Sequence, residues 1–403
     1  MKILHSSDWH LGRSLYTKKD RQDEHRAFFD WLLKTIAEQE IELLIVAGDV
    51  FDTASPSIGA QKMYYDFLIK VRNSGCRKLI VVGGNHDSPS FLNAPKDILA
   101  ALDVSVVGAA DENPEDEIIV VEDKNGNPAL IVCAVPFLRE RDVSRFVEGE
   151  NYNDRSLRIN ESIRKHYEYI AELAEKKRDA LGVKIPIIAT GHLSVVGGAR
   201  LDDDGVRDTY IGNIAAVSTD IFPKTFEYVA LGHYHIGSAL KPHIRYCGSP
   251  IPMGFGEAAD KKLIYVLEFC PELKVDEIEI PVFQRLEAIK GDKEFIEKRL
   301  MELRDAKISI WLEVTYNAKD SFPNLSEWID ELTANTEIEV LKKQNAVNLN
   351  VYLTSDDTTY SLDELSPEMV FEKLLEKKDF SEEHKEELRM THEIILSGLK
   401  IEA

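Results

Sequence analysis

The sequence predicts a layered α/β fold, because short apolar runs alternate with amphipathic helical segments from residue 1 to about 280. Helical spacing is clear between residues 22 and 40, where Phe28, Leu32 and Ile36 recur on one face. Two further observations refine this prediction. Five of the apolar runs end in residues that can bind a metal ion, and the pattern changes after Pro281. We therefore expect one large α/β domain followed by smaller units.

Each of the five runs is typical of a buried strand, since it is short, continuous and rich in Ile, Leu and Val. In four of them a glycine directly precedes the first polar residue, and we expect it to let the backbone turn sharply as it leaves the sheet. The runs are KILHSSDWH (2 to 10), LLIVAGD (43 to 49), LIVVGGNHD (79 to 87), IIATGH (187 to 192) and YVALGHYH (228 to 235).

The ends of these runs supply a possible ligand set for two metal ions. Ligands in open α/β sheets bind at the carboxyl ends of strands, so residues far apart in sequence can meet there. Carboxylate, amide and imidazole donors without thiolate suit Mn, Fe or Zn better than Ca. His5, by contrast, lies inside the first strand and is interpreted as a core histidine. The seven candidate ligands are Asp8, His10, Asp49, Asn85, His192, His233 and His235.

The remaining segments define the domain organisation. The dipeptide Asn125-Gly126 predicts a hairpin between strands 117 to 122 and 129 to 135, and residues 149 to 184 are polar and helical. After Pro281 we expect a strand (285 to 289), a helix (292 to 304), a strand (308 to 315), a helix (324 to 334) and a strand (337 to 353). Two short amphipathic helices follow from about residue 361. The predicted domains are 1 to 280, 281 to 356 and 361 to 403.

Composition sets the outer limits. The 403 residues are 44% hydrophobic, which is ample for a core, and no apolar stretch approaches the length of a membrane span. The first strand begins at Lys2, which leaves no room for a cleavable signal peptide. Four scattered cysteines form no CxxC pair, so we interpret them as reduced packing residues. These observations favour a cytoplasmic protein without a membrane partner.

The formal net charge of −22 argues against a nucleic-acid partner, because phosphate binding depends mainly on Lys and Arg. Bulk charge is a weak argument, however, since bound divalent ions would cancel part of it where it matters. Basic residues also lie beside the motifs, in two groups that an ordinary solvated surface could equally explain. These are Arg13, Lys18, Lys19 and Arg21 in one group, and Arg139, Arg141 and Arg145 in the other.

Taken in order, the motifs resemble those of the calcineurin-like metallophosphoesterases: Asp-x-His, Gly-Asp-x-x-Asp, Gly-Asn-His-Asp, Gly-His and Gly-His-x-His. This resemblance implies a sandwich of two mixed sheets flanked by helices. The match narrows to the SbcD family of bacterial nuclease subunits, which pair with SMC-like ATPases of the SbcC type. Stretches that resemble that family include HSSDWHLGRSLY, VAGDVFDTASPS, GNHDSPSFLN, ATGHLSVVGG, ALGHYHIGSAL and RYCGSPIPMGF.

The resemblance implies a role for each site residue. One metal would bind Asp8, His10 and His235, the other Asn85, His192 and His233, with Asp49 bridging both. His86 would assist the leaving group, with Asp87 orienting its ring. Archaeal and eukaryotic relatives usually have His at the place of Asp52, so here Asp52 is expected to orient a ligand or cap the following turn. Weaker candidates for substrate contact are Arg13, Tyr16 and Ser249.

The resemblance also implies a function: a nuclease that uses two divalent ions, Mn²⁺ or alternatively Mg²⁺. It would act on DNA as a double-strand 3′–5′ exonuclease and a single-strand or hairpin endonuclease, in DNA end processing, replication and recombination. Residues 281 to 356 would form a capping domain, and residues 361 to 403 would bind the ATPase, within a heterotetramer that contains a homodimer of this chain. Two alternatives stay open. These are a two-metal phosphoesterase for phosphoprotein or nucleotide substrates, and a non-catalytic scaffold.

Overall fold

The computed structural model describes most of the chain up to residue 346. The described residues are 1–16, 19–110, 113–144, 147, 149–196, 216–318 and 322–346, with Phe371, Leu375, Lys385, Leu388 and Arg389 beyond them. The predicted two-helix tail from residue 361, the end of the predicted strand 337 to 353, and Lys18 and Arg145 lie outside the described residues.

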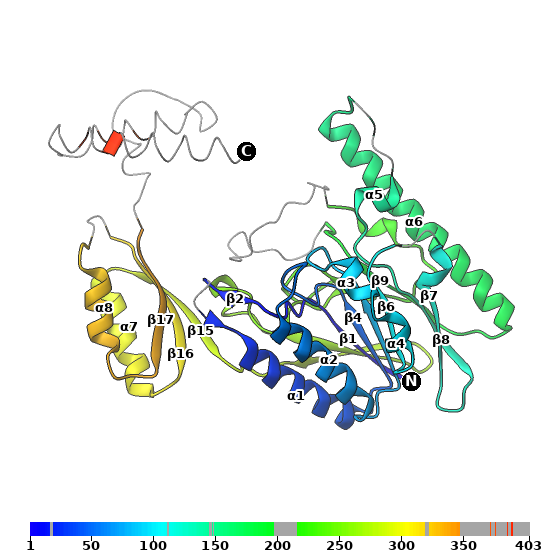
Figure 1. Ribbon diagram of the computed structural model, residues 1–403, viewed down its shortest axis with the longest axis horizontal. Helices are drawn as coiled ribbons and strands as arrows, with labels where there is room; N and C mark the ends of the chain where they lie inside the picture. The colour runs from blue at the N-terminus through cyan, green and yellow to red at the C-terminus, as the bar shows by residue number, and fades with distance from the viewer. Residues whose placement is uncertain are drawn as a thin grey trace.

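Two six-stranded sheets form the body of the protein (Figure 1). The first has the order β14-β13-β1-β4-β5-β6. Four of its six strands, β1, β4, β5 and β6, are parallel to one another. The strands are β1 (Lys2–Ser6), β4 (Leu43–Ala47), β5 (Lys78–Val82), β6 (Val104–Val107), β13 (Leu263–Phe269) and β14 (Leu273–Glu279).

The second sheet has the order β11-β12-β10-β9-β8-β7, and β8, β9, β10 and β12 are parallel. Strands β7 and β8 pair as the antiparallel hairpin that the sequence predicted around Asn125-Gly126. The strands are β7 (Ile118–Glu122), β8 (Pro128–Cys133), β9 (Ile187–His192), β10 (Tyr228–Gly232), β11 (Ser238–Lys241) and β12 (Ile244–Tyr246).

Alternation along the strands of the second sheet explains the layering. In β8, Leu130 and Val132 pack into the cluster shared with the first sheet, whereas Ile131 and Cys133 pack toward α6 (Tyr152–Leu181). Successive side chains of a strand point to opposite faces, so a strand buried on both sides is apolar throughout. The core therefore lies between the sheets, beneath α6 on the outer face of the second sheet, and beneath the helices on the outer face of the first.

Helices cover the outer faces of both sheets (Figure 1). Phe28 and Leu32 of α1 (Gln22–Gln39) and Tyr64 and Phe67 of α2 (Ile58–Arg72) belong to the core of the first sheet. Short segments complete the body: β2 (Ser14–Leu15), β3 (Lys19–Asp20), α3 (Pro89–Asn93), α4 (Lys96–Ala100), η1 (Pro114–Glu117), α5 (Glu140–Val143), η2 (Thr219–Ile221) and η3 (Phe255–Glu257).

Residues 285–345 form a smaller α/β unit with its own core. Three parallel strands in the order β15-β16-β17 are connected by two helices that pack together over the sheet. The elements are β15 (Arg285–Gly291), α7 (Lys293–Ala306), β16 (Ile310–Tyr316), α8 (Leu325–Thr333) and β17 (Ile338–Asn345), close to the predicted bounds. No helix among the described residues is long and apolar enough to cross a membrane.

Candidate metal centre

The five predicted strand ends converge at one edge of the two sheets. β1, β4 and β5 of the first sheet are parallel to one another, as are β9 and β10 of the second, so within each sheet these strands end at the same edge. Contacts between β4 and the pair β9 and β10 bring the two sheets together there. The seven candidate ligands are therefore brought together, although 227 positions separate the first from the last.

One group of donors contains Asp8, His10 and His235. A carboxylate oxygen and one ring nitrogen from each histidine lie within 4.8 Å of one another. The Nε2 atoms of His10 and His235 are 3.2 Å apart. All three side chains are buried, so the donors face each other rather than solvent.

A second group of donors surrounds the side-chain oxygen of Asn85. Its Oδ1 atom lies 3.0 Å from His192 Nε2 and 3.0 Å from His233 Nδ1. Asp49 stands between the two groups, because its Oδ2 atom is 3.1 Å from His192 Nε2 and 3.6 Å from His10 Nε2. One carboxylate oxygen therefore reaches both sets of imidazoles.

These donors fit divalent metal ions. In an octahedral shell with ligands at about 2.1 Å, neighbouring donors stand about 3 Å apart, as the paired nitrogens and oxygens do here. Two fully buried carboxylates, Asp8 and Asp49, also call for compensating positive charge. Donors of this type, oxygen and imidazole without sulfur, favour first-row divalent ions over Ca²⁺. The donor set therefore fits divalent metal ions, with Asp49 within reach of both donor groups.

The second nitrogen of each ligand histidine meets an acceptor, which fixes which nitrogen faces the centre. His192 Nδ1 lies 2.9 Å from the carbonyl oxygen of Ala47, and His235 Nδ1 lies 3.0 Å from Glu257 Oε1. His233 is turned the other way, with Nε2 3.0 Å from Ser194 Oγ. His10 Nδ1 faces Asp52 Oδ1 at 3.3 Å, at an angle too oblique for a regular hydrogen bond.

The ionisable side chains at the centre lie close enough to shift one another's pKa. Burial raises the pKa of Asp8, whereas the neighbouring imidazoles, His192 first, overcome burial and hold the pKa of Asp49 well below its usual value. Burial also acts against a charged His192 ring, but the Asp49 carboxylate raises the pKa of His192 to about 9. Burial, helped by the charge of His192, lowers the pKa of His233 to about 3. A cation at this place would compete with the proton on His192.

The backbone that carries the ligands is strained. Four ligands that are not glycine have positive φ angles: 52° at Asp8, 46° at His10, 49° at Asp49 and 101° at His233. Each such residue costs on the order of 1–3 kcal/mol, and such outliers cluster at functional sites. Packing of neighbouring side chains stabilises this strained backbone. Trp9, between two of these ligands, is fully buried against Phe29 and Phe67 (ring centroids 5.0 and 5.2 Å apart).

Three of the four glycines before the candidate ligands serve a purpose different from the predicted one. Gly48 has a positive φ of 90°, as a sharp turn requires, but no positive φ occurs at Gly84, Gly191 or Gly232. Instead, these three positions are crowded. A Cβ atom at Gly84 would stand 2.1 Å from Asp49 Oδ1, and one at Gly232 would stand 1.9 Å from the carbonyl oxygen of Ala47. Glycine is needed there because strand ends approach each other closely.

The structure places His86 beside the first donor group, within 4.8 Å of donor atoms of His10 and Asp49. Its Nδ1 atom lies 2.9 Å from the carbonyl oxygen of Asp52, so that carbonyl holds the ring. The expectation that Asp87 orients this ring is wrong. Both Asp87 oxygens accept backbone N–H groups instead, from Val50, Phe51 and Gly84, at 2.9–3.1 Å. Asp87 thus fixes the loops that carry the ligands.

Of the three candidates for substrate contact, Ser249 is corrected by the structure. Ser249 is completely buried, and its hydroxyl bonds the carbonyl oxygen of Ile251 at 2.9 Å, so it cannot reach a macromolecular substrate. Tyr16 is occupied elsewhere, with its hydroxyl 2.6 Å from Glu313 Oε2 in β16. Arg13 lies near the centre, where its Nη1 is 3.3 Å from Asp52 Oδ1. Asp52 therefore contacts both the ligand His10 and Arg13.

Sequence reasoning missed several residues that support the ligands. Glu257, Ser194 and the carbonyl of Ala47 contact ligand histidines but follow no local spacing rule, because the chain brings them together only on folding. His25, also fully buried, holds the carbonyl oxygen of Trp9 at 2.7 Å. The burial of Trp9 itself could have been suspected, since an aromatic residue separates two ligands in Asp-x-His.

Arg139 is a further residue of the site that motif order did not identify. Its side chain is only 14% exposed, and its Nη2 donates to the carbonyl oxygen of Asp87 at 3.2 Å. Nη1 is buried without a hydrogen-bond partner among the described residues. Burial lowers the pKa of Arg139, while the carboxylates of Asp142, Asp87 and Asp49 act in the opposite direction. A part-buried guanidinium group therefore contacts the loop that carries the candidate ligand Asn85.

Comparison with known families assigns the class of the protein. Residues 1–237 match the model of the calcineurin-like phosphoesterases, so the chain belongs to that family. Residues 282–379 match a second model, named for the C-terminal domain of a type 5 capsule protein repressor. The resemblance inferred from the ordered motifs, and the fold class it implied, are thereby confirmed. The family depends on divalent metals, in agreement with the donor groups.

Relatives identify the branch of the family. The chain is 35% identical over 396 residues to the SbcD subunit of the nuclease SbcCD from Escherichia coli (strain K12), and the match covers 96% of each protein. It is 34% identical over 267 residues to the SbcD protein of Rhodobacter capsulatus, and 29% identical over 276 residues to that of Bacillus subtilis, with 64% and 67% of each chain covered. The chain therefore belongs to the SbcD family of nuclease subunits.

Proposed function

We propose that the chain is a metal-dependent DNA nuclease that acts as a double-strand 3′–5′ exonuclease and as a single-strand or hairpin endonuclease. The observation that carries this proposal is the position of Asp49, whose Oδ2 atom reaches both His192 and His10. A shared carboxylate is what two-metal hydrolysis of phosphodiesters requires. The relatives, named as nucleases, supply the substrate class.

Each donor group would bind one ion. Asp8, His10 and His235 would hold the first, and Asn85, His192 and His233 the second, with Asp49 common to both. Mn²⁺ suits this set best, because imidazole nitrogens make up four of the seven donors, and Mg²⁺ prefers oxygen and water. Mg²⁺ remains the alternative ion for activity in solution.

When bound, two ions would supply an activated water molecule and would neutralise charge on the phosphate oxygens. The chain itself supplies the proton for the departing oxygen. The His86 ring donates its Nδ1–H to the carbonyl oxygen of Asp52, which leaves Nε2 to carry the proton that the leaving oxygen takes up. A positioned acid of this kind contributes about 10²- to 10⁴-fold in rate. Asp87 keeps the loop of His86 in place through backbone hydrogen bonds.

Substrate contact is assigned to Arg139 and Arg13. The part-buried Arg139 guanidinium group lies 4.0 Å from Asp142 Oδ2, and its Nη1 makes no hydrogen bond among the described residues, so a phosphodiester could accept one there. Arg13 stands on the other side, beside Asp52. These local positive charges, together with the ions, offset the overall charge of −22 where DNA would bind.

The partner would be an SMC-like ATPase of the SbcC type, bound by residues 361 to 403, with residues 281 to 356 as the capping domain over the nuclease domain of residues 1 to 280. A homodimer of this chain would form the centre of the heterotetramer. The relatives are subunits of SbcCD by name, and the match of residues 282–379 supports a partner-related C-terminal region. Roles in DNA end processing, replication and recombination, and a cytoplasmic location, would follow from this assembly.

A matrix of metals and substrates tests the proposal. The purified chain is offered Mn²⁺, Mg²⁺ or Zn²⁺ with linear duplex DNA, hairpin DNA, phosphoserine peptide or cyclic nucleotide, with and without the ATPase partner. We expect cleavage of duplex ends and hairpins in Mn²⁺. Hydrolysis of phosphoserine or cyclic nucleotide with intact DNA would instead make the protein a phosphoesterase of another specificity. If no substrate is cleaved, but loss of the chain from cells is complemented by Asp49→Ala, the protein is a scaffold.

A truncation tests the partner assignment separately. A chain that ends before Asp363 should keep Mn²⁺-dependent nuclease activity, because every assigned metal ligand lies before residue 236. It should fail to bind the SbcC-type ATPase in a pull-down experiment. Binding that survives the truncation would show that the partner uses another surface.

A further inference from the structure

The short helix η3 carries a completely buried carboxylate that contacts a metal ligand. Glu257 Oε1 lies 3.0 Å from His235 Nδ1, and the exposed fraction of Glu257 is 0%. Its other oxygen, Oε2, accepts the backbone N–H of Met253 at 3.0 Å and contacts Lys262 Nζ. The charges of His235 and Lys262 overcome the effect of burial and hold the pKa of Glu257 well below its usual range.

Lys262 fixes the backbone of the same ligand. Its Nζ atom donates to the carbonyl oxygen of His235 and to Ser249 Oγ, each at 3.0 Å. Both the ring and the main chain of His235 are thus held by one buried ion pair, Glu257 with Lys262. Because a buried ion pair adds little net stability, its value here lies in orientation. A carboxylate on Nδ1–H keeps Nε2 directed at the metal centre.

The other side of η3 packs against the unit formed by residues 285–345. The ring of Phe255 stacks on Tyr16, with centroids 5.8 Å apart and planes inclined by 9°. Phe255 also belongs to a buried cluster with Leu286 of β15 and Trp311 of β16. The Tyr16 hydroxyl bonds Glu313, so β16 is tied to the same place by a polar contact. The helix η3 therefore touches the metal ligand and the C-terminal unit at once.

We propose that η3 links the unit of residues 285–345 to the metal ligand His235, with Glu257 as the positioning residue, a role that rests on the proposed metal-dependent function. A movement of this unit would shift Phe255, and with it the carboxylate that orients His235. Productive metal and catalytic geometry tolerates displacements of only about 0.5 Å or 10–20°. The C-terminal unit thereby controls the affinity of the first ion, which Asp8, His10 and His235 share.

Calorimetric titration of the full-length chain with Mn²⁺ tests the positioning role without any substrate. The wild-type chain should bind two ions. In Glu257→Gln, which keeps the size and an acceptor oxygen but removes the charge, the affinity of one ion should fall about 10- to 100-fold, and the other should change little. The matched control is Glu279→Gln, because Glu279 is exposed and, among the described residues, its side chain pairs only with Lys261, at 2.7 Å. Two unchanged affinities in Glu257→Gln overturn the positioning role.

A second variant tests the link and leaves Glu257 in place. Leu286→Ala removes packing from Phe255, so we expect a several-fold weaker affinity for the same ion. The control on the same unit is Glu302→Gln, which breaks only the exposed pair with Arg299. Thermal unfolding in EDTA shows that each variant is folded. If Leu286→Ala is folded and binds both ions as the wild type does, the link is wrong.

These outcomes separate the inference from the function on which it rests. A wild-type chain that binds fewer than two Mn²⁺ ions contradicts the proposed two-metal site itself. A wild-type chain that binds two ions, with variants that bind identically, contradicts only the role of η3.

Discussion

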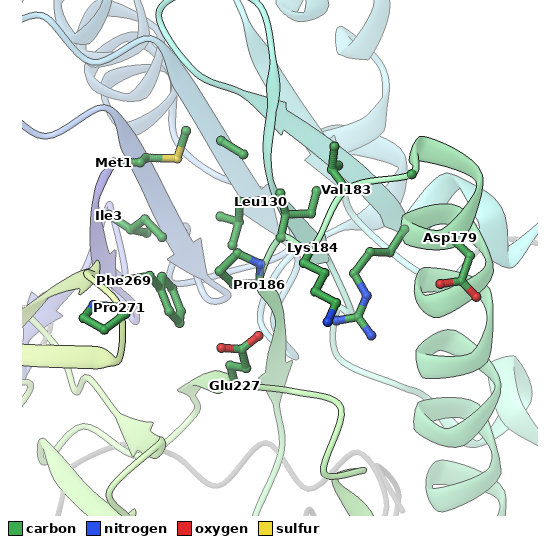
Figure 2. A pocket seen from close by; sticks show the side chains of 14 residues that line it. Met1, Ile3, Leu130, Asp179, Val183, Lys184, Pro186, Glu227, Phe269 and Pro271 are labelled. Carbon is green, nitrogen blue, oxygen red and sulfur yellow. The ribbon is translucent and has the colours of Figure 1, made fainter.

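The carboxyl edge and the amino edge of the two sheets are formed by the same strands but carry different residues. At the amino edge lies a cavity of about 730 Å³, lined by Met1, Leu130, Pro186 and Phe269 among others (Figure 2). Glu227 lines it as well and is exposed. At the carboxyl edge, in contrast, ligand atoms of buried side chains stand 3.0–3.6 Å apart.

A roomy cavity therefore does not by itself indicate a metal centre, since the cavity at the amino edge contains none of the candidate ligands. Apolar residues such as Leu130 and charged residues such as Arg178, Asp179 and Glu227 line the cavity at the amino edge together. Convergent polar atoms on strained backbone arise only when the whole fold supports them, because four positive φ angles and two buried carboxylates are unfavourable alone. Substitutions at the carboxyl edge should therefore affect metal binding or DNA cleavage, whereas substitutions at the amino edge should not.

Loss of the shared carboxylate should have the largest effect. Asp49→Ala removes a carboxylate oxygen that reaches both donor groups, so DNA cleavage in Mn²⁺ should fall at least about 10³-fold, which corresponds to several kcal/mol of lost charge stabilisation. The matched control at the amino edge is Glu227→Gln, which should cleave as the wild type does. Comparable losses in the two variants, measured on the same hairpin substrate, would erase the distinction between the edges.

Removal of the proposed acid should slow catalysis and spare metal binding. In His86→Ala the rate should fall about 10²- to 10⁴-fold, because the leaving oxygen loses its proton donor while the seven ligands remain. Single-turnover cleavage gives the rate, and calorimetry gives the Mn²⁺ affinity. An equal loss of metal would make His86 a ligand and not an acid.

Arg139 and Arg141 allow a part-buried cation to be compared with an exposed one. Arg139→Met should raise KM for DNA about 10-fold or more, because a charge-assisted hydrogen bond to phosphate is worth about 1.5–3 kcal/mol. The control is Arg141→Met, since the Arg141 side chain is 75% exposed. Mn²⁺ affinity should not decrease in either variant. If KM rises equally in both, general surface charge explains the effect and the assignment of Arg139 is lost.

The smallest effect on DNA cleavage is expected from a change in the core, away from the metal centre. His5 is fully buried, its Nε2 has no hydrogen-bond partner among the described residues, and burial lowers its pKa to about 3. The unfolded chain would bind a proton near pH 6.5 that the folded chain does not. The contribution of His5 is therefore complete above pH 6.5 and is lost as the pH falls toward 3, by up to about 1.4 kcal/mol per pH unit.

His5→Asn should accordingly flatten the pH dependence of the free energy of unfolding between pH 6.5 and 4, by at most one proton. Urea unfolding in EDTA at several pH values measures the slope. Equal slopes in the variant and the wild type would mean that His5 becomes protonated in the folded protein.

Sequence alone predicted the strands, the convergence of the seven ligands and the core position of His5, because each depends on local pattern or on the rule that ligands gather at strand ends. The helices and strands after Pro281 were also predicted to within a few residues. The supporting contacts were not. Glu257 reaches His235 across a loop, and Asp87 turns to backbone amides, because such partners are set by tertiary packing and not by spacing.

The substrate contacts show the same limit. Ser249 and Tyr16 were chosen because they lie near motifs in the sequence, yet one is buried beside Lys262 and the other is bonded to Glu313. Proximity along the chain does not give the direction of a side chain. Arg139 stands at the site because Phe137 donates its backbone N–H to the carbonyl oxygen of Gly83, a contact between distant segments.

We propose that seven side chains hold two metal ions and that Asp49 contacts both. Crystals of the full chain grown with Mn²⁺ and measured at the manganese absorption edge test it most directly. Two anomalous peaks about 3.5–4 Å apart, with Asp49 in contact with both, are the predicted result. A single peak, or two peaks of which Asp49 contacts only one, would contradict the account.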